Sequence, residues 1–281
     1  MKNFIGTVEA KHGKFNFCHF DEFIGLSLRE YGEYSELELS TIQNFIKKGD
    51  VVFDIGANIG AFSVPLAKKV GSTGKVYSFE PQPYIAGLLN QNIKSNKLRN
   101  VKILRKALGF KKQTLKLDDI DYSKVGNFGG VGLVLNNSGF TKLKSKKKHN
   151  ISVTKLDKFL YVNSCNFIKI DVEFMELDVL RGGEKFLKKF RPIVWVENHK
   201  TYPNDVNNFL LKNDYTPYWA VTMLFNPDNY FVNDVNYYNN AATINTLAVP
   251  KEKRNFCVNS NLFNEIIDAN TPPINAVTKL N

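Results

Sequence analysis

The stretch VVFDIGANIGAFSV, residues 51–64, constrains the fold more than any other part of the sequence. Its first five residues are apolar except for Asp54, which is typical of a buried strand, and Gly56 and Gly60 follow in a short turn. A helical pattern begins after this turn. A strand that turns sharply into a helix opens a βαβ unit, and the turn is where α/β proteins hold nucleotide-like ligands.

Strand and helix patterns alternate along the rest of the chain. Strands are predicted at 51–55, 75–80, 101–108, 167–172, 192–198, 215–221 and 243–250. Helices are predicted at 35–48, 60–70 with a kink at Pro65, 83–96, 175–183 and 204–212. This alternation predicts an α/β fold with a Rossmann-like, doubly wound and mostly parallel sheet, in which the last two strands form a terminal antiparallel hairpin at the edge.

The domain organisation follows from where this alternation is interrupted. Residues 1–34 alternate only weakly and predict an N-terminal extension or lid of short strands or irregular structure. Residues 35–281 form the main domain, with insertions near 109–150 and 225–240. The second insertion is rich in Asn and Tyr, which suit contacts to sugar hydroxyls but equally suit an ordinary polar surface loop.

Composition excludes some classes of protein. No apolar run is long enough to span a membrane and no secretory signal opens the chain, so we expect a cytoplasmic protein without a membrane span. The three cysteines lie far apart and predict buried free thiols. A net charge of +11 suits nucleic acid, anionic glycan or acidic membrane. The cluster KLKSKKKH at 142–149 predicts a solvated loop, with guidance of a polyanionic acceptor as the alternative. Nothing in the sequence indicates an oligomeric state.

The turn after the first strand indicates the charge of its ligand. It lacks the G-x-G-x-x-G spacing with which dinucleotide-binding proteins hold a pyrophosphate. Asp54 stands just before the turn, and a carboxylate there repels phosphate but attracts an ammonium or sulfonium group. The ligand is therefore expected to carry positive charge and no phosphate near this turn.

A second acid indicates a ribose. Glu80 ends the second predicted strand, where a carboxylate can accept hydrogen bonds from both hydroxyls of an adenosine ribose. Pro81 follows and fixes the chain beside the adenine. Together with Asp54, these residues predict S-adenosylmethionine as the cofactor in preference to a nicotinamide dinucleotide.

Three motifs in order resemble one family. The elements D-x-G-A-N-x-G at 54–60, F-E-P at 79–81 and I-K-I-D-V-E at 168–173 resemble the FkbM family of S-adenosylmethionine-dependent methyltransferases. The resemblance covers about residues 33–200, including the upstream YSELE, and extends to the final strand INTLAVP. It implies a seven-stranded class I methyltransferase sheet and O-methylation, often of sugar or polyketide hydroxyls.

The resemblance also implies roles for individual residues. The methionine side of the cofactor would lie against Asp54, Gly56, Ala57, Asn58 and Gly60, and its ribose against Glu80. Ala107, at the end of the third predicted strand, lies where the adenine packs in the family. One departure is Phe174, which replaces the small residue of the family pattern D-V-E-G-x-E. We expect it to narrow the acceptor pocket or reshape the start of the next helix.

Candidate catalytic residues follow two later strands. A sugar hydroxyl is a poor nucleophile at neutral pH and benefits from a general base. Asp171 and Glu173 leave one strand, and Glu197 and His199 leave another, so all four are candidates. Asp171, Glu173 and Glu197 also have the oxygen chemistry of a Mg²⁺ site, although no metal is predicted.

The predicted function is O-methylation, dependent on S-adenosylmethionine, of a hydroxyl on a sugar, glycan or similar small molecule. The basic charge leaves methylation of RNA or another nucleic acid as an alternative. Two details count against it: Asp171-Val172-Glu173-Phe174 stands where amino methyltransferases carry Asn/Asp-Pro-Pro-aromatic, and Glu197 stands where a ribose-methylating tetrad needs lysine. A second alternative is a non-catalytic protein that binds S-adenosylmethionine.

Overall fold

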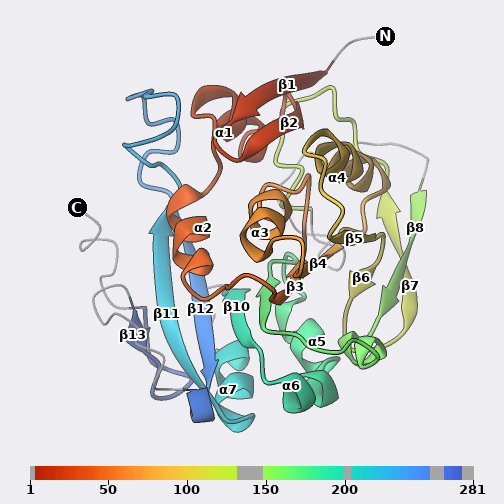
Figure 1. The fold of residues 1–281 in the computed structure, drawn as a ribbon, viewed down its shortest axis with the longest axis vertical. Helices are drawn as coiled ribbons and strands as arrows, with labels where there is room; N and C mark the ends of the chain where they lie inside the picture. Colours follow the sequence, from red (N-terminus) through yellow and green to blue (C-terminus); the bar gives the residue numbers. More distant parts are fainter. Residues whose placement is uncertain (1–3, 132–147, 199–203, 254–262, 274–281) are drawn as a thin grey trace.

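A computed structural model describes residues 4–131, 148–198, 204–253 and 263–273 (Figure 1). A large central sheet carries helices on both faces, and smaller elements pack around its upper and right-hand edges in this view. None of the helices in the described ranges is long and apolar enough to cross a membrane. Cys18 and Cys165 are buried free thiols, as expected, whereas Cys257 lies outside the described residues.

The central sheet has the order β13-β11-β12-β10-β9-β3-β4-β5. Its strands are β3 (Val51–Ile55), β4 (Lys75–Phe79), β5 (Val101–Leu104), β9 (Phe167–Ile170), β10 (Ile193–Glu197), β11 (Tyr215–Met223), β12 (Ala242–Pro250) and β13 (Asn264–Glu265). The five strands from β5 to β10 are parallel, and β12 is antiparallel to both β10 and β11. The predicted doubly wound sheet and its terminal antiparallel hairpin are thus confirmed, but β13 covers β11 and makes an eighth strand.

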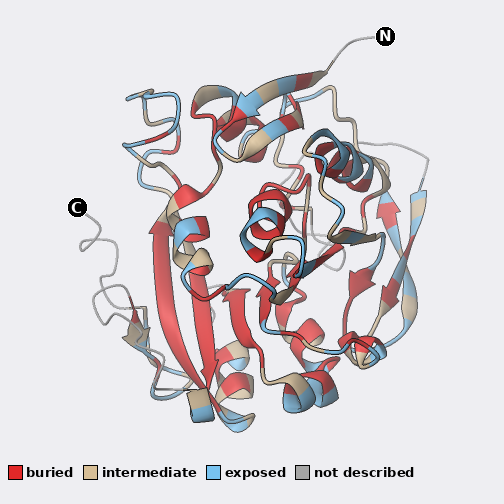
Figure 2. Ribbon diagram, in the orientation of Figure 1, coloured by how far each residue is buried: buried red, intermediate tan, exposed pale blue. Residues whose placement is uncertain are grey.

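Three helices cover each face of this sheet. They are α2 (Glu36–Gln43), α3 (Ser63–Val70) and α4 (Pro83–Ser95) on one face, and α5 (Glu176–Arg181), α6 (Glu184–Phe190) and α7 (Asp205–Lys212) on the other. Successive residues of β3 serve the two layers: Val52 packs with α2 and α3, and Phe53 with Phe186 of α6. Figure 2 shows the resulting red strands between helices that are exposed on their outer sides. Because β3 is buried on both faces, it is apolar throughout apart from Asp54.

Two smaller groups of elements lie outside the central sheet. The N-terminal part forms a hairpin, β1 (Ile5–Ala10) and β2 (Gly13–Cys18), followed by α1 (Ile24–Glu30). A three-stranded sheet contains β6 (Ala107–Leu108), β7 (Gln113–Asp118) and β8 (Lys148–Thr154), and short 3₁₀ helices lie at Leu156–Phe159 and Lys251–Lys253. The N-terminal part contacts the loop after β7 at Gly126. The N–H of Gly126 donates to the carbonyl of Phe20, and the carbonyl of Gly126 accepts from the N–H of Glu22.

The loop between β11 and β12 packs on α1 and the residues after it. The Tyr31 hydroxyl donates to the carbonyl of Val235 at 2.9 Å and accepts from the N–H of Tyr237. The Tyr238 hydroxyl donates to the carbonyl of Phe23 at 2.6 Å. Segments about 200 residues apart in the sequence therefore lie side by side above α2 (Figure 1).

Several local predictions need correction. The strand predicted at 101–108 is interrupted after Leu104, and Ala107 belongs to β6, which pairs with β8 in the small sheet. The segment FIGLSL forms α1, not a strand or irregular lid. The first predicted helix ends at Gln43. Pro65 lies in the first turn of α3, where backbone N–H groups make no hydrogen bond within the helix. Proline therefore removes no helical hydrogen bond there, and the predicted kink is not needed. Most of the basic cluster at 142–149 lies outside the described residues, and its last two residues begin β8.

Candidate active site

The site lies where the strand order of the sheet reverses. The chain moves outward from β3 to β4 and β5, then returns to place β9 on the other side of β3. Ligands of such sheets bind beyond the carboxyl ends of the strands at this point. Here the ends of β3 and β9 touch: the N–H of Asp171 donates to the carbonyl of Ile55 at 3.0 Å. Gly56 has φ +88°, and a Cβ built on it would lie 1.7 Å from the carbonyl oxygen of Asp171.

A cavity of about 460 Å³ opens at these strand ends. Its lining contains the predicted cofactor residues Gly56, Ala57, Asn58, Pro81 and Ala107, together with Gln82, Lys106 and most of the loop 127–131. It also contains Tyr34, Glu38, Lys169, Asp171, Glu173, Glu197, Asn198 and residues 241–245. Phe23 and Ile24, at the start of α1, line it as well. The cavity therefore combines the glycine turn and the candidate catalytic strand ends in one space.

Asp54 is buried beside the cavity and does not line it. Its side chain is fully buried, and the Ser63 hydroxyl donates to Oδ2 at 2.5 Å. Oδ1 is buried with no hydrogen-bond partner among the described residues. Burial raises the pKa of Asp54, and the positive charge of Lys169 opposes this shift. The predicted contact between Asp54 and a sulfonium group thus remains a prediction.

Glu80 holds the turn together. Its carboxylate accepts the N–H of Asn58 at 3.0 Å and the N–H of Gln82 at 2.8 Å. Asn58 has φ +47°, a conformation that costs a non-glycine residue energy, and the bond to Glu80 stabilises it. Glu80 is only 4% exposed and does not line the cavity. Each carboxylate oxygen of Glu80 already accepts one hydrogen bond within the protein. The predicted contact between Glu80 and a ribose stays a prediction.

The remaining predicted cofactor residues differ in their positions. Pro81 and Ala107 line the cavity, although Ala107 reaches it from β6 of the small sheet and not from the third strand of the central one. Gly60 does not line it: Gly60 has φ +93°, and a Cβ there would lie 2.7 Å from Leu89 Cδ1 of α4. Gly60 thus serves the packing of the turn against a helix.

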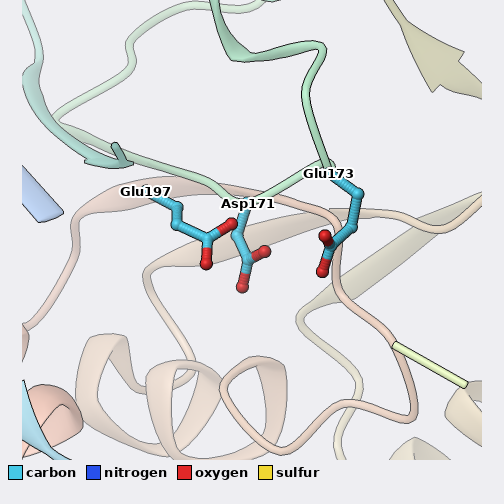
Figure 3. Close-up of side chains that lie close together, drawn as sticks. All are labelled: Asp171, Glu173 and Glu197. Carbon is cyan, nitrogen blue, oxygen red and sulfur yellow. The ribbon is translucent and has the colours of Figure 1, made fainter. Parts of the chain in front are cut away.

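Three of the four predicted catalytic residues come together. Figure 3 shows the carboxylates of Asp171, Glu173 and Glu197 pointing into the same space, with Asp171 between the other two. One oxygen from each lies within 4.8 Å of the others. These oxygens have the chemistry that Mg²⁺ prefers, but the Lys169 ammonium already lies 2.9 Å from Asp171 Oδ2, and we assign no metal to the group. His199 lies outside the described residues.

Crowding of the carboxylates alters their protonation. Burial, and then the charges of Asp171 and Glu176, raise the pKa of Glu173 to about 8. Burial and the charges of Asp171 and Glu173 hold the pKa of Glu197 well above its ordinary value. Like charges this close do not all ionise at neutral pH, so the group retains protons that it can exchange with a bound hydroxyl.

Stability is expected to fall as pH rises through the neutral range. The pKa values of Glu80, Glu173 and Glu176 are raised from 4.5 to about 7, 8 and 7, mainly by burial. Between pH 4.5 and 8 the native state therefore binds more protons than the unfolded chain, and the free energy of unfolding decreases with pH. Thermal melts of the protein without cofactor are expected to show a lower Tm at pH 8 than at pH 5.5. Glu173→Gln, which removes one titrating group, should narrow this difference; a Tm that rises over the same interval would contradict the assignment.

Two functional candidates were not predicted from the sequence. Lys169 lies in the middle of β9 with its side chain only 3% exposed, yet it lines the cavity. Glu38 of α2 is 5% exposed and also lines it. Two features of the sequence could have indicated these residues. One is a lysine within the otherwise apolar strand FIKI, and the other is an acid on the buried side of the first predicted helix. Asn198 follows Glu197 and is fixed by hydrogen bonds to the side chains of Asn204, Asn207 and Thr246.

Phe174 does not narrow the cavity, contrary to one of our two expectations. Its side chain is not part of the lining, and the residue is 49% exposed. It has φ +72°, after Glu173 at φ +53°, and the two residues form the turn that leads into α5. A glycine adopts this conformation without strain, which explains why a small residue suits the position.

Phe174→Gly is expected to stabilise the protein. Positive φ costs a residue with a side chain about 1–2 kcal/mol, and the greater freedom of glycine in the unfolded chain offsets about half of that. A rise in Tm of about 2 °C is expected in a thermal melt. Phe110→Gly is the matched control, because Phe110 is 51% exposed and is not among the positive-φ residues. If Phe174→Gly lowers the Tm as much as the control, the strain is not present.

Comparison with known proteins assigns the family. Residues 54–217, more than half of the chain, match the family model described as the Methyltransferase FkbM domain. The chain belongs to the FkbM methyltransferase family. The resemblance of the three motifs is thereby confirmed, and the mostly parallel central sheet is the Rossmann-like sheet expected for this methyltransferase family.

Other similarities to this FkbM methyltransferase are weaker. A methyltransferase FkbM from Methylobacillus flagellatus is 14% identical, with a TM-score of 0.45, over 75% of this chain and 50% of that one. Trm5b from Pyrococcus abyssi is 13% identical, with a TM-score of 0.46, over 88% of this chain and 56% of that one. A "Probable ribosomal RNA small subunit methyltransferase A" from Methanosphaera stadtmanae is 35% identical over 80 residues, which are 28% of this chain and 26% of the relative. The chain thus matches about a quarter of that curated relative's length.

Proposed function

We propose that this FkbM methyltransferase transfers the methyl group of S-adenosylmethionine to a hydroxyl of a sugar, glycan or similar small molecule. The observation that carries the proposal is the group of three carboxylates, Asp171, Glu173 and Glu197, which line the same cavity as the predicted cofactor residues. A hydroxyl needs a base when it attacks, and this group supplies one within a cavity that the glycine turn enters.

The residues of the cavity fit S-adenosylmethionine. The close contact of Gly56 with the backbone of Asp171 leaves no room for a side chain and brings the turn against the catalytic strand end. Ala57, Asn58, Pro81 and Ala107 line the half of the cavity that we assign to the cofactor. Bound there, the cofactor supplies a methyl group made electrophilic by its sulfonium.

The chain itself moves a proton and aligns the acceptor. Asp171 takes the proton of the acceptor hydroxyl as the new C–O bond forms, while the electron pair of the breaking C–S bond stays on sulfur. The products are a methyl ether and S-adenosylhomocysteine, and the proton passes from Asp171 to water. Alignment contributes most of the rate of such an in-line displacement, so the walls around the acceptor matter as much as the base.

The charges at the acceptor end favour a neutral acceptor over a phosphate. Glu38, Asp171, Glu173 and Glu197 line this end, and Lys169, which also lines it, is paired with Asp171. A phosphate would add negative charge to a group that already retains protons because its carboxylates lie so close together, whereas a sugar hydroxyl adds none. The net charge of +11 and the short match to a ribosomal RNA methyltransferase are what favour RNA as the second candidate. The cytoplasmic location remains a prediction.

A labelled-methyl assay tests the acceptor class. The protein is incubated with radiolabelled S-adenosylmethionine and, separately, neutral sugars, nucleotide sugars, oligosaccharides and structured RNA at about 150 mM salt. Label is expected in an alkali-stable ether on a sugar or glycan, with RNA at background. Label in RNA alone would replace this proposal by the nucleic-acid function. Cofactor binding in calorimetry without transfer to any acceptor would favour a non-catalytic protein.

A further inference from the structure

The position of Lys169 is unusual for a lysine. Its side chain rises from the middle of β9 and is 3% exposed, with Nζ 2.9 Å from Asp171 Oδ2 and 4.6 Å from the centre of the Phe62 ring. Asp54 of β3 lies directly opposite Lys169 in the sheet, and so does Trp195 of β10, whose indole donates to Glu38 of α2. Both carboxylates therefore lie near enough for their charges to act on the ammonium. One buried ammonium thus stands among three carboxylates that come from three elements.

Glu38 is held as firmly as Lys169. Its Oε1 accepts from Trp195 Nε1 at 2.9 Å, and its Oε2 accepts from Ser35 Oγ at 3.0 Å and Thr243 Oγ1 at 3.2 Å. These donors come from the helix start, β10 and β12 and leave the carboxylate little freedom. Its negative charge favours the ammonium of Lys169 where the fold would otherwise penalise a buried cation.

The environment of Lys169 excludes it as the general base. Burial lowers the pKa of Lys169, but the charges of Asp171, Asp54 and Glu38 outweigh burial and raise it above its ordinary value. The side chain therefore stays an ammonium, which donates hydrogen bonds and cannot accept a proton. Lys169 is thus not the base, although it lies beside the acceptor end of the cavity.

We propose that Lys169 and Glu38 are a positioning pair for Asp171. Glu38 fixes the ammonium of Lys169 by charge, and Lys169 binds Asp171 Oδ2, so that the other oxygen of Asp171 faces the acceptor hydroxyl. The pair gives the YSELE segment, upstream of the family match, a part in the reaction. This inference rests on the proposed role of Asp171 as base.

A double-mutant cycle separates positioning from a purely structural role. Lys169→Met is expected to lower kcat about 100-fold, since a displacement of about 1 Å at the reacting group costs that much, while KM for the acceptor changes less than about threefold. In an Asp171→Asn background the same substitution should change kcat less than about threefold, because the group it positions is already inactive. Equal losses in both backgrounds would overturn the proposal. Lys189→Met, on the exposed side of α6, is the matched control and should leave kcat unchanged.

Glu38→Gln gives a second test if Lys169→Met fails to fold. The amide oxygen can still accept from Trp195 but no longer carries the charge that holds Lys169, so kcat should fall about tenfold, and only when Asp171 is intact. Glu36→Gln is the control, since Glu36 lies on the same helix and pairs with Lys11 and His12 outside the cavity. An unchanged kcat for Glu38→Gln overturns the proposal.

Crystal structures of the variants with S-adenosylhomocysteine give a readout without turnover. Asp171 is expected to rotate away from its present position in Lys169→Met or Glu38→Gln, and an unmoved carboxylate overturns the proposal. Each kinetic comparison uses one acceptor, whether sugar or RNA. Failure of the proposed acceptor class is therefore distinguishable from failure of the positioning pair.

Discussion

Gly56→Ala is expected to abolish cofactor binding and to destabilise the fold. The added methyl group would lie 1.7 Å from the carbonyl oxygen and 2.8 Å from the carbonyl carbon of Asp171, and φ at the position is +88°. Both neighbours are backbone atoms of a strand end, which cannot move aside as a flexible side chain can. Overpacking and positive φ together cost about 2–5 kcal/mol, which corresponds to a fall in Tm of about 5–15 °C.

Gly87→Ala is the control for this substitution. Gly87 lies inside α4, is exposed, and has nothing within 4 Å of the place where a Cβ would stand. Alanine there should raise stability by about 1 kcal/mol and leave affinity unchanged. Calorimetry with S-adenosylmethionine and a thermal melt measure both variants. If Gly56→Ala binds the cofactor and melts like the unmodified protein, the ends of β3 and β9 do not meet as described.

Asp171→Asn is expected to lower kcat about 10²–10⁴-fold, the usual contribution of a general base. Asparagine keeps the volume and an oxygen for Lys169 but takes no proton from the acceptor. Cofactor affinity should stay within about tenfold, because Asp171 lines the half of the cavity assigned to the acceptor. The measurements are kcat with the accepted sugar and the dissociation constant of the cofactor.

Asp178→Asn is the matched control for Asp171→Asn. Asp178 follows in α5, only seven positions later, and does not line the cavity. It should leave both kcat and affinity unchanged. Normal turnover by Asp171→Asn would remove Asp171 from the reaction and leave Glu173 or Glu197 as the base.

The convergence of Asp171, Glu173 and Glu197 was predictable from sequence. Each follows a strongly apolar strand, and parallel strands bring their carboxyl ends to one edge of a sheet. The same reasoning placed Gly56 and Asn58 at the cavity, because a turn after the first strand has the same destination. These inferences need only the type and direction of each strand.

The roles of Asp54, Glu80 and Lys169 required the structure. The sequence places these two acids and the lysine within strands or at their ends, but it does not show toward which side each side chain points. Asp54 and Glu80 are turned into the protein and hold Ser63, Asn58 and Gln82, whereas Lys169 reaches the cavity. The direction of each side chain is set by the register of β3, β4 and β9, which cannot be read from the pattern of a single strand.

Ala107 illustrates a different limit. The run VKILRKAL reads as one apolar strand, yet the chain leaves the central sheet after Leu104 and pairs two residues with β8 instead. That pairing depends on a partner more than forty residues later in the chain, which no local pattern contains. Phe174 shows the reverse case, in which the departure from the family pattern was visible and its cost, a positive φ, appeared only in the structure.

The hydrogen bond from Thr243 to Glu38 joins residues 205 positions apart across the wall of the cavity. A ribosome delivers the chain from its amino end, so the glycine turn and the carboxylates emerge well before β12 exists. Until β12 has been synthesised and paired, the cavity lacks the part of its lining that residues 242–245 supply. The nascent polypeptide should consequently be inactive until β12 has been translated and has paired with β10 and β11.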